Sequence, residues 1–165
     1  MDEIREIISS LTVSDRVRED ALAVYQSIAE AESQVHQTEV SEIHFHEVGA
    51  MDAVADIVGC AYMIEKLRPE KIVFSPIVTG YGSVRCAHGI LPVPAPATAL
   101  LLRGIPSCAG HERGELATPT GAALAGYYGQ DFSTRPLMTV DKIGYGMGTK
   151  DFHTANCVRA FLGQG

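Results

Sequence analysis

The stretch from residue 51 to about residue 66 limits the fold more than any other part of the chain, because it is apolar on nearly every side of a helix. A helix of that kind is buried. A β-rich run follows in "EKIVFSPIV" and predicts a buried strand. A buried helix that leads into a buried strand is typical of α/β proteins. The apolar positions of the helix are Met51, Val54, Ile57, Val58, Ala61, Met63 and Ile64.

Three further segments predict helices. Residues 2–36 contain two amphipathic stretches, and Ser14 or Asp15 can cap the second. The segment "HGILPVPAPATALLLRG" starts extended, because its prolines forbid an early helix, and then forms a helix that ends near Gly104. In "ELATPTGAALAGYYG", Thr118 is a good N-cap and Pro119 fits the first helical position.

Two more strands are predicted near "PLMTVDKI" and "NCVRAFL", separated by the glycine-rich turn "GYGMGTKD". A length of 165 residues with 46% hydrophobic residues suits one soluble domain. We therefore expect a single α/β domain with a helical N-terminal arm over 1–36. Residues 37–165 would form the core of the same domain, a mixed sheet flanked by helices. A mixed α+β arrangement is the alternative.

Charge and cysteine content exclude several classes of function. The net charge is -7 and no run of Lys or Arg exists, which argues against nucleic-acid binding. The apolar runs are too short to cross a bilayer, and the acidic start "MDEIREIISS" is not a signal peptide. The four cysteines form no CxxC pair, as expected of reduced thiols in the cytoplasm. We therefore expect a cytoplasmic protein that contacts neither nucleic acid nor membrane.

The segment "IHFHEVGAMDAVAD" concentrates side chains that bind metals. If residues 43–47 form a strand, His44 and His46 project from the same face, with α-carbons roughly 7 Å apart. Two imidazoles so placed can chelate zinc or nickel. Glu47 follows directly, and Asp52 and Asp56 share one face of the next helix. This pattern predicts a metal site.

Structural explanations for the same residues stay open. A helical turn that ends at Gly49 is the alternative to the strand. Asp52 alone suits the positive end of a helix, and an Arg partner would explain Asp56 equally well. Against these alternatives, we expect His44, His46 and Asp56 to line one cavity as metal ligands.

Other candidate residues lie further along the chain. In "RCAHG", Cys86 is interpreted as a small buried hydrophobe, whereas His88 is a functional candidate beside a glycine. Thr118, Thr120 and Gly121 stand at a helix start, where free N–H groups attract an anion. The segment "GYGMGTK" is no P-loop, but its backbone at Gly146 and Gly148 could cradle a phosphate beside Lys150. Capping alone and a tight hairpin turn are the respective alternatives.

Four motifs together resemble the LarC nickel-insertion proteins: "IHFHEVGAMDAVADIVG", "CAHGILPVPAPAT", "ELATPTGAAL" and "KIGYGMGT". The resemblance extends from the N-terminal helices to about Gly163. It implies a role in making the nickel-pincer nucleotide of lactate racemase, by inserting nickel into pyridinium bis-thiocarboxylic acid mononucleotide. The reaction forms a carbon–nickel bond, which would make the family protein a cyclometallase of the lyase class. The residues that stand in the family's polar motifs, as candidates for nickel delivery or substrate contact, are His44, His46, Glu47, Asp52, Asp56 and His88.

The resemblance also implies what this chain needs from elsewhere. Family proteins begin with a further segment that carries a "DCFSGISGDM"-like sequence, and they continue into a part that resembles a CTP-binding domain. The chain therefore corresponds to the central portion of the family protein. CTP with Mg or Mn is expected to serve the full-length family and not to be bound by this chain. The expected partners are the mononucleotide, the two further parts and, as an alternative, other copies of the chain. A metal- and nucleotide-binding or assembly module without catalysis of its own is the alternative function.

Overall fold

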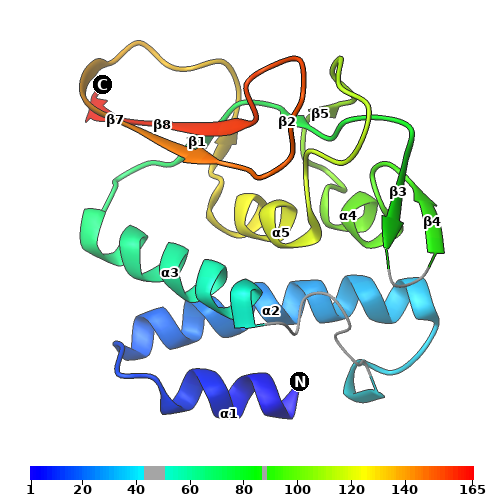
Figure 1. Ribbon diagram of the computed structural model, residues 1–165. Helices are drawn as coiled ribbons and strands as arrows, with labels where there is room; N and C mark the ends of the chain where they lie inside the picture. The colour runs from blue at the N-terminus through cyan, green and yellow to red at the C-terminus, as the bar shows by residue number, and fades with distance from the viewer. Residues whose placement is uncertain (43–50, 87–88) are drawn as a thin grey trace.

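The structure is a computed structural model that describes residues 1–42, 51–86 and 89–165 (Figure 1). Helices form one side of the molecule, and the strands lie beyond α3, α4 and α5, away from α1 and α2. No helix in these three ranges is long and apolar enough to cross a membrane. The helical segments are α1 (Asp2–Ser10), α2 (Asp15–His36), the short 3-10 helix η1 (Val40–Glu42), α3 (Met51–Leu67), α4 (Pro96–Leu101) and α5 (Pro119–Tyr128).

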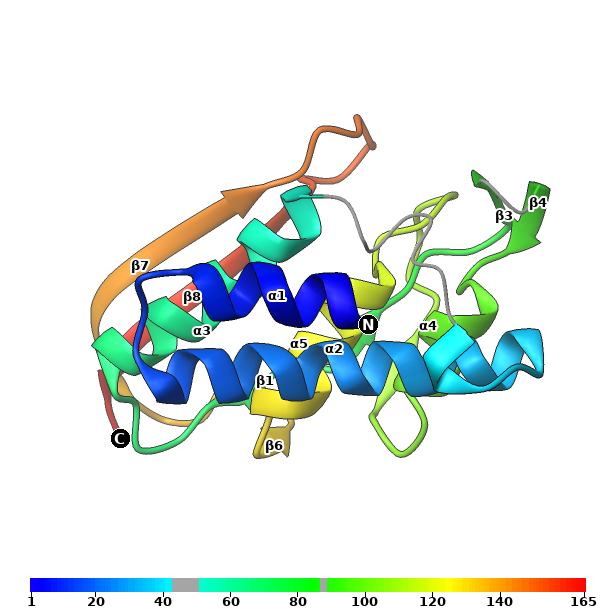
Figure 2. The same ribbon diagram turned by 90° about the horizontal axis from the view of Figure 1, so that it is seen from below.

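Helix α2 is the centre of the helical side, because it contacts α1, α3, α4 and α5 (Figure 2). It begins as predicted at Ser14, whose side-chain oxygen accepts a hydrogen bond from the Val17 amide. The buried core draws residues from four helices, so the N-terminal helices share one core with the rest. Its members are Ile4, Ile8, Ala21, Val24, Tyr25, Ile28, Ala53, Val54, Ile57 and Ala123.

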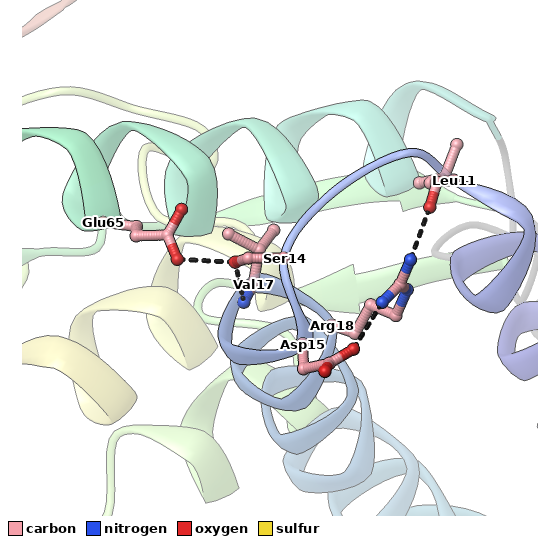
Figure 3. A network of polar contacts seen from close by, with 6 residues as sticks. All are labelled: Leu11, Ser14, Asp15, Val17, Arg18 and Glu65. Carbon is pink, nitrogen blue, oxygen red and sulfur yellow. Dashed lines mark hydrogen bonds and ion pairs between the residues drawn. The ribbon is translucent and has the colours of Figure 1, made fainter.

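A hydrogen bond joins the turn between α1 and α2 to the last turns of α3 (Figure 3). The Ser14 hydroxyl donates a hydrogen bond of 2.5 Å to the Glu65 carboxylate. On the other side of the turn, Arg18 donates to Asp15 at 2.6 Å and to the Leu11 carbonyl at 2.9 Å. One capping residue therefore starts α2 and also holds α3 alongside it.

Helix α3 was predicted with nearly the correct bounds, but the expectation that it is buried on almost every side is wrong. Ala53, Val54, Ile57 and Ala61 form its buried face. Methionines on the outer face are open to solvent, with Met51 65% exposed. The physical reason is that the helices that contact α3, namely α1, α2 and α5, cover its buried face and leave the outer face open.

The mixed composition of helix and strand is confirmed, and the strands predicted near residues 136–143 and 156–162 are present. The segment "EKIVFSPIV" forms two short strands that are half-buried or exposed, so the prediction of one buried strand is wrong. The strand predicted at residues 43–47 lies outside the described residues.

Among the described residues the strands pair as four two-stranded sheets, so the expected mixed sheet is divided into small pieces. The pairs β1–β6 and β2–β5 are parallel, whereas β3–β4 and β7–β8 are antiparallel. The strands are β1 (Val73–Phe74), β2 (Ile77–Val78), β3 (Ser83–Cys86), β4 (Gly89–Pro92), β5 (Ser107–Cys108), β6 (Asp131–Phe132), β7 (Thr139–Met147) and β8 (Cys157–Gln164).

The glycine-rich segment near residue 145 is a strand and not the predicted turn. Strand β7 continues through Gly144 and Gly146, which pair with Ala160 and Val158 of β8. Glycine can occupy an extended strand when a partner strand supplies the hydrogen bonds. The connection between the two strands therefore falls later in the chain, at residues 148–156.

A close backbone crossing positions the start of α5. The Gly114 amide donates to the Tyr81 carbonyl at 2.8 Å, and the Leu116 amide donates to the Thr79 carbonyl at 2.9 Å. Gly80 has a φ of +81°, and a Cβ there would lie 1.8 Å from the Gly114 carbonyl oxygen. Because no other residue fits this approach, glycine is required for the segment that leads into α5.

Candidate functional site

The acidic pair predicted on α3 lies at the surface. Asp52 and Asp56 occupy successive turns, and both are exposed. The Asp52 carboxylate accepts a hydrogen bond of 2.9 Å from the Ala53 amide at the start of the helix. The two carboxylates are therefore not buried, although apolar residues surround them in the sequence. Both groups are accessible to an ion or substrate that approaches α3 from solvent.

The negative charge of this pair affects the pKa values of two neighbouring groups. Tyr25 of α2 is fully buried, and burial, followed by the charges of Asp52 and Asp56, raises the pKa of its phenol to about 12. On α3 itself, burial and then the Asp56 charge raise the pKa of the Cys60 thiol. In both groups the negative charge adds to the effect of burial and favours the protonated form.

Three of the residues predicted to bind an anion, Thr118, Thr120 and Gly121, lie at the start of α5. Thr118 caps this helix as predicted, and its side-chain oxygen accepts from the Gly121 amide at 3.2 Å. Lys150, from the connection between β7 and β8, donates to the Glu115 carbonyl at 3.4 Å and has its ammonium nitrogen 3.8 Å from the Glu115 carboxylate. The structure thus brings Lys150 close to the segment that leads into Thr118.

The two glycines predicted to cradle a phosphate have different positions. Gly146 lies inside β7, opposite Val158, so it belongs to no loop. Gly148 follows the strand, and its amide donates to the Asn156 carbonyl at 3.0 Å. The Asn156 side chain in turn donates to the Lys150 carbonyl at 2.9 Å. In this conformation Gly148 and Asn156 shape the connection that carries Lys150.

Helices α3 and α5 run in the same direction, and their N-terminal ends point toward the side of the β3–β4 hairpin (Figures 1 and 2). Ala53 near the start of α3 and Ala123 near the start of α5 belong to the same buried cluster. The starts of the two helices carry the exposed carboxylates of α3 and the capped first turn of α5.

Four predicted residues, namely His44, His46, Glu47 and His88, lie outside the described residues, so their arrangement stays a prediction. The same holds for the expectation that Asp56 faces a cavity with the two histidines of "HFH". Within residues 1–42, 51–86 and 89–165, no three His, Cys, Asp or Glu side chains come together to hold a metal ion. Cys86 ends β3 and is half-buried.

Two residues that the sequence reasoning missed become prominent in the structure. Tyr25 is one, because burial and then the charges of Asp52 and Asp56 raise the pKa of its phenol. Glu112 is the other: it is buried, and its carboxylate accepts bonds from the Thr154 amide at 2.8 Å and the Thr154 hydroxyl at 2.7 Å. The hydrogen bond from the Thr154 hydroxyl lowers the pKa of this carboxyl most, and burial opposes it. Backbone hydrogen bonds from Thr154 and His153 lower the pKa further. No local pattern in the sequence marks either residue.

Comparison with known proteins identifies the family. A family model described as nickel insertion protein matches residues 1–165. The chain belongs to this family. Its relatives include the pyridinium-3,5-bisthiocarboxylic acid mononucleotide nickel insertion protein of Clostridium kluyveri, which is 42% identical over 164 residues. Proteins of the same name from Clostridium acetobutylicum and Staphylococcus saprophyticus are 44% and 41% identical over 162 and 158 residues.

The matches cover nearly all of this chain but a minor part of the relatives. They include 99%, 98% and 96% of the chain, against 41%, 39% and 40% of the three relatives. The chain thus spans about two fifths of the length of the curated nickel insertion proteins that it matches. No solved structure matches the chain.

Proposed function

We propose that this chain supplies nickel-handling and substrate-binding residues for the insertion of nickel into pyridinium-3,5-bisthiocarboxylic acid mononucleotide. The observation that carries the proposal is the family match over the whole chain, together with relatives whose names state this activity. Because the chain spans about two fifths of those relatives, we assign it a part of the reaction, and catalysis by the complete family protein includes the rest.

Nickel is the substrate ion in this proposal. His44, His46 and Asp56 would bind it, since imidazole nitrogens suit a borderline ion and a carboxylate lowers the net charge of the complex. When the carbon–nickel bond forms, the pyridinium carbon loses its proton, which a basic side chain must accept. The candidates for that role, or for substrate contact, are His44, His46, Glu47, Asp52 and His88.

The mononucleotide carries a phosphate, and the start of α5 supports its binding. Of the first amides of the helix, that of Gly121 already donates to Thr118, and Pro119 has none. The Thr120 amide and hydroxyl are therefore the groups that we assign to the anion. Lys150 would add a positive charge from the connection after Gly146 and Gly148, provided that it exchanges its contact with Glu115 for the phosphate.

We propose that CTP and its Mg or Mn ion act outside this chain, because the resemblance places CTP binding in a further part of the family protein. We therefore route no step through CTP in this chain. If CTP hydrolysis drives the reaction, we place it in the part of the family protein that this chain does not match.

A nickel titration on the 165-residue chain tests the binding role. Changing both His44 and His46 to Ala should abolish high-affinity nickel binding, because the variant loses the chelate and not one contact. Its melting temperature should stay close to that of the wild type. A matched control changes two histidines elsewhere, His36 and His111, and should retain nickel binding.

The outcome shows whether His44 and His46 bind nickel or only stabilise the fold. A His44/His46 variant that melts at a much lower temperature but binds nickel as before would show that the two imidazoles stabilise the fold.

The role in the reaction is tested by replacing the matching segment of the Clostridium kluyveri relative with this chain. Incorporation of radioactive nickel into the mononucleotide by this chimera, and its loss with the double variant, is the expected result. A chimera that folds, binds nickel and incorporates none would favour a binding or assembly module without catalysis.

A further inference from the structure

A buried glutamate joins the connection between β7 and β8 to the rest of the molecule. Glu112 is only 6% exposed, and one oxygen of its carboxylate accepts hydrogen bonds from both the amide and the hydroxyl of Thr154. The backbone of Glu112 is also fixed, because its carbonyl accepts a hydrogen bond of 3.2 Å from the Tyr81 amide. Glu112 therefore attaches the connection to a segment that is itself held in place.

Two further contacts hold the same connection against the segment that leads into α5. The Phe152 ring lies beside Gly114, where a Cβ would be only 3.6 Å from a ring carbon. The Lys150 ammonium lies 3.4 Å from the carbonyl oxygen of Glu115. Inside the connection, the Asn156 side chain donates to the Lys150 carbonyl at 2.9 Å. The place of Lys150 thus depends on contacts made along the whole connection.

Of these contacts, the one with Glu112 costs most to break. The Lys150 side chain is 53% exposed, and its ion pair with Glu115 at 3.8 Å is of the exposed kind that stabilises little. The Glu112 carboxylate is charged and buried, and without Thr154 its oxygen would lose both donors. Strands β7 and β8 pack mainly on each other among the described elements, so the position of their connection relies on this attachment.

We propose that Glu112 is a positioning residue for substrate binding, which holds the β7–β8 connection so that Lys150 stays within reach of the mononucleotide phosphate. The inference rests on the proposed function, which assigns Lys150 to that phosphate. In this role Lys150 exchanges Glu115 for the phosphate while the connection stays in place. The buried carboxylate of Glu112 provides the fixed attachment, and it does so without touching the substrate.

The test compares Glu112→Ala with Glu112→Gln by calorimetric titration of the 165-residue chain with pyridinium-3,5-bisthiocarboxylic acid mononucleotide. Alanine removes the acceptor, so we expect about 5- to 10-fold weaker binding, close to the loss from Lys150→Ala. Glutamine keeps an oxygen that can accept both bonds from Thr154, so Glu112→Gln should bind at least as tightly as the wild type. Glu65→Ala is the matched control: its carboxylate also accepts a hydroxyl bond, from Ser14, and its loss should leave the affinity unchanged.

A double-mutant cycle provides a readout that a merely structural role would not change. If Glu112 acts through Lys150, Glu112→Ala should weaken binding little further once residue 150 is alanine. Additive losses in the two variants, or wild-type affinity in Glu112→Ala, overturn the inference. Equal losses in Glu112→Ala and Glu112→Gln also overturn it, because they would assign the effect to the charge of the carboxylate and not to its hydrogen bonds.

A second variant keeps the inference testable if Glu112→Ala fails to fold. Thr154→Val removes the hydroxyl donor at an exposed position, so it disturbs the core less. It should weaken mononucleotide binding in the wild-type background and have little effect together with Lys150→Ala. Wild-type affinity in Thr154→Val would then contradict the positioning role.

The two proposals fail in different ways. A chain that does not bind the mononucleotide, or binds it equally well after Lys150→Ala, overturns the assignment of Lys150 in the proposed function and the role of Glu112 with it. Binding that depends on Thr120 and Lys150, but is indifferent to Glu112→Ala, leaves the proposed function intact and removes the positioning role alone.

Discussion

Asp20 joins the beginning of α2 to the end of α5 through two tyrosines. The Tyr127 hydroxyl donates to one carboxylate oxygen at 2.8 Å, and the Tyr128 hydroxyl donates to the other at 3.2 Å. The two rings meet edge to face with their centroids 4.8 Å apart. Burial, and then the Asp20 charge and hydrogen bond, raise the pKa of the Tyr128 phenol. We predict that Asp20→Ala destabilises the fold by separating these helix ends.

The size of the effect follows from the exposure of the three groups. A hydrogen bond to a charged acceptor contributes about 1.5–3 kcal/mol when it is shielded from water. Tyr127 is 43% exposed, so water can replace Asp20 as its acceptor at little cost. Tyr128 is half-buried and depends more on the carboxylate. Since alanine gains roughly 0.5 kcal/mol in helix propensity, the net loss should be about 1–2 kcal/mol, or roughly 2–8 °C in melting temperature.

Calorimetry or circular dichroism on Asp20→Ala measures the loss, with Glu19→Ala as the matched control. Glu19 is an exposed carboxylate next to Asp20 on α2, so this control also replaces a carboxylate with alanine, with a smaller gain in helix propensity, and leaves the hydrogen bonds of Asp20 in place. A double-mutant cycle with Tyr128→Phe should give a coupling energy of about 1 kcal/mol. If Asp20→Ala and Glu19→Ala melt at the same temperature, or if the coupling energy is near zero, the hydrogen bonds from Tyr127 and Tyr128 to Asp20 do not stabilise the fold.

Two further predictions concern Glu112 and the core. The pKa of Glu112 is lowered in the folded state, so its stabilising contribution is present above the ordinary carboxyl pKa and is lost as pH falls through the lowered value. The protection of the Thr154 amide against hydrogen exchange, measured relative to the intrinsic exchange rate at each pH, should therefore fall below about pH 4, and Glu112→Gln should remove that pH dependence; an unchanged protection profile would contradict the assignment. Ile57→Ala in the fully buried core should cost about 2–5 kcal/mol in the free energy of unfolding, whereas Met63→Ala on the outer face of α3, 54% exposed, should change it by less than about 0.5 kcal/mol. Similar losses in both variants would mean that α3 is not anchored through its inner face.

The helices were predictable because their signals are local. Ser14 and Thr118 cap α2 and α5 at the predicted residues, since a cap needs a polar side chain and the next turn of the same chain. The short parallel strands were harder to predict. Val73 pairs with Asp131 and Ile77 with Ser107, partners that are far apart in sequence, so no local pattern shows how the strands divide into small sheets.

The candidate site was predictable where the periodicity of one helix was enough. The spacing of Asp52 and Asp56 placed them on one face of α3, and the structure confirms the helix. Their exposure was predicted wrongly, because hydrophobic residues surround them in the sequence and the packing partners of α3 cover only its inner face. Tyr25 and Glu112 were missed, since their importance comes from contacts between distant segments.

The acidic pair places two like charges on successive turns of α3, and the buried face of the helix offsets their repulsion. Like charges one turn apart on a helix destabilise it by about 0.2–0.5 kcal/mol, although Asp52 recovers part of this at the positive end of α3. The burial of Val54 and Ile57 on the opposite face contributes about 1.5–3 kcal/mol for each side chain, so α3 tolerates the repulsion without a bound ion. Under the proposed nickel-binding role, a divalent ion between the carboxylates would replace that repulsion with attraction, so the surface of α3 would gain stability when the ion binds.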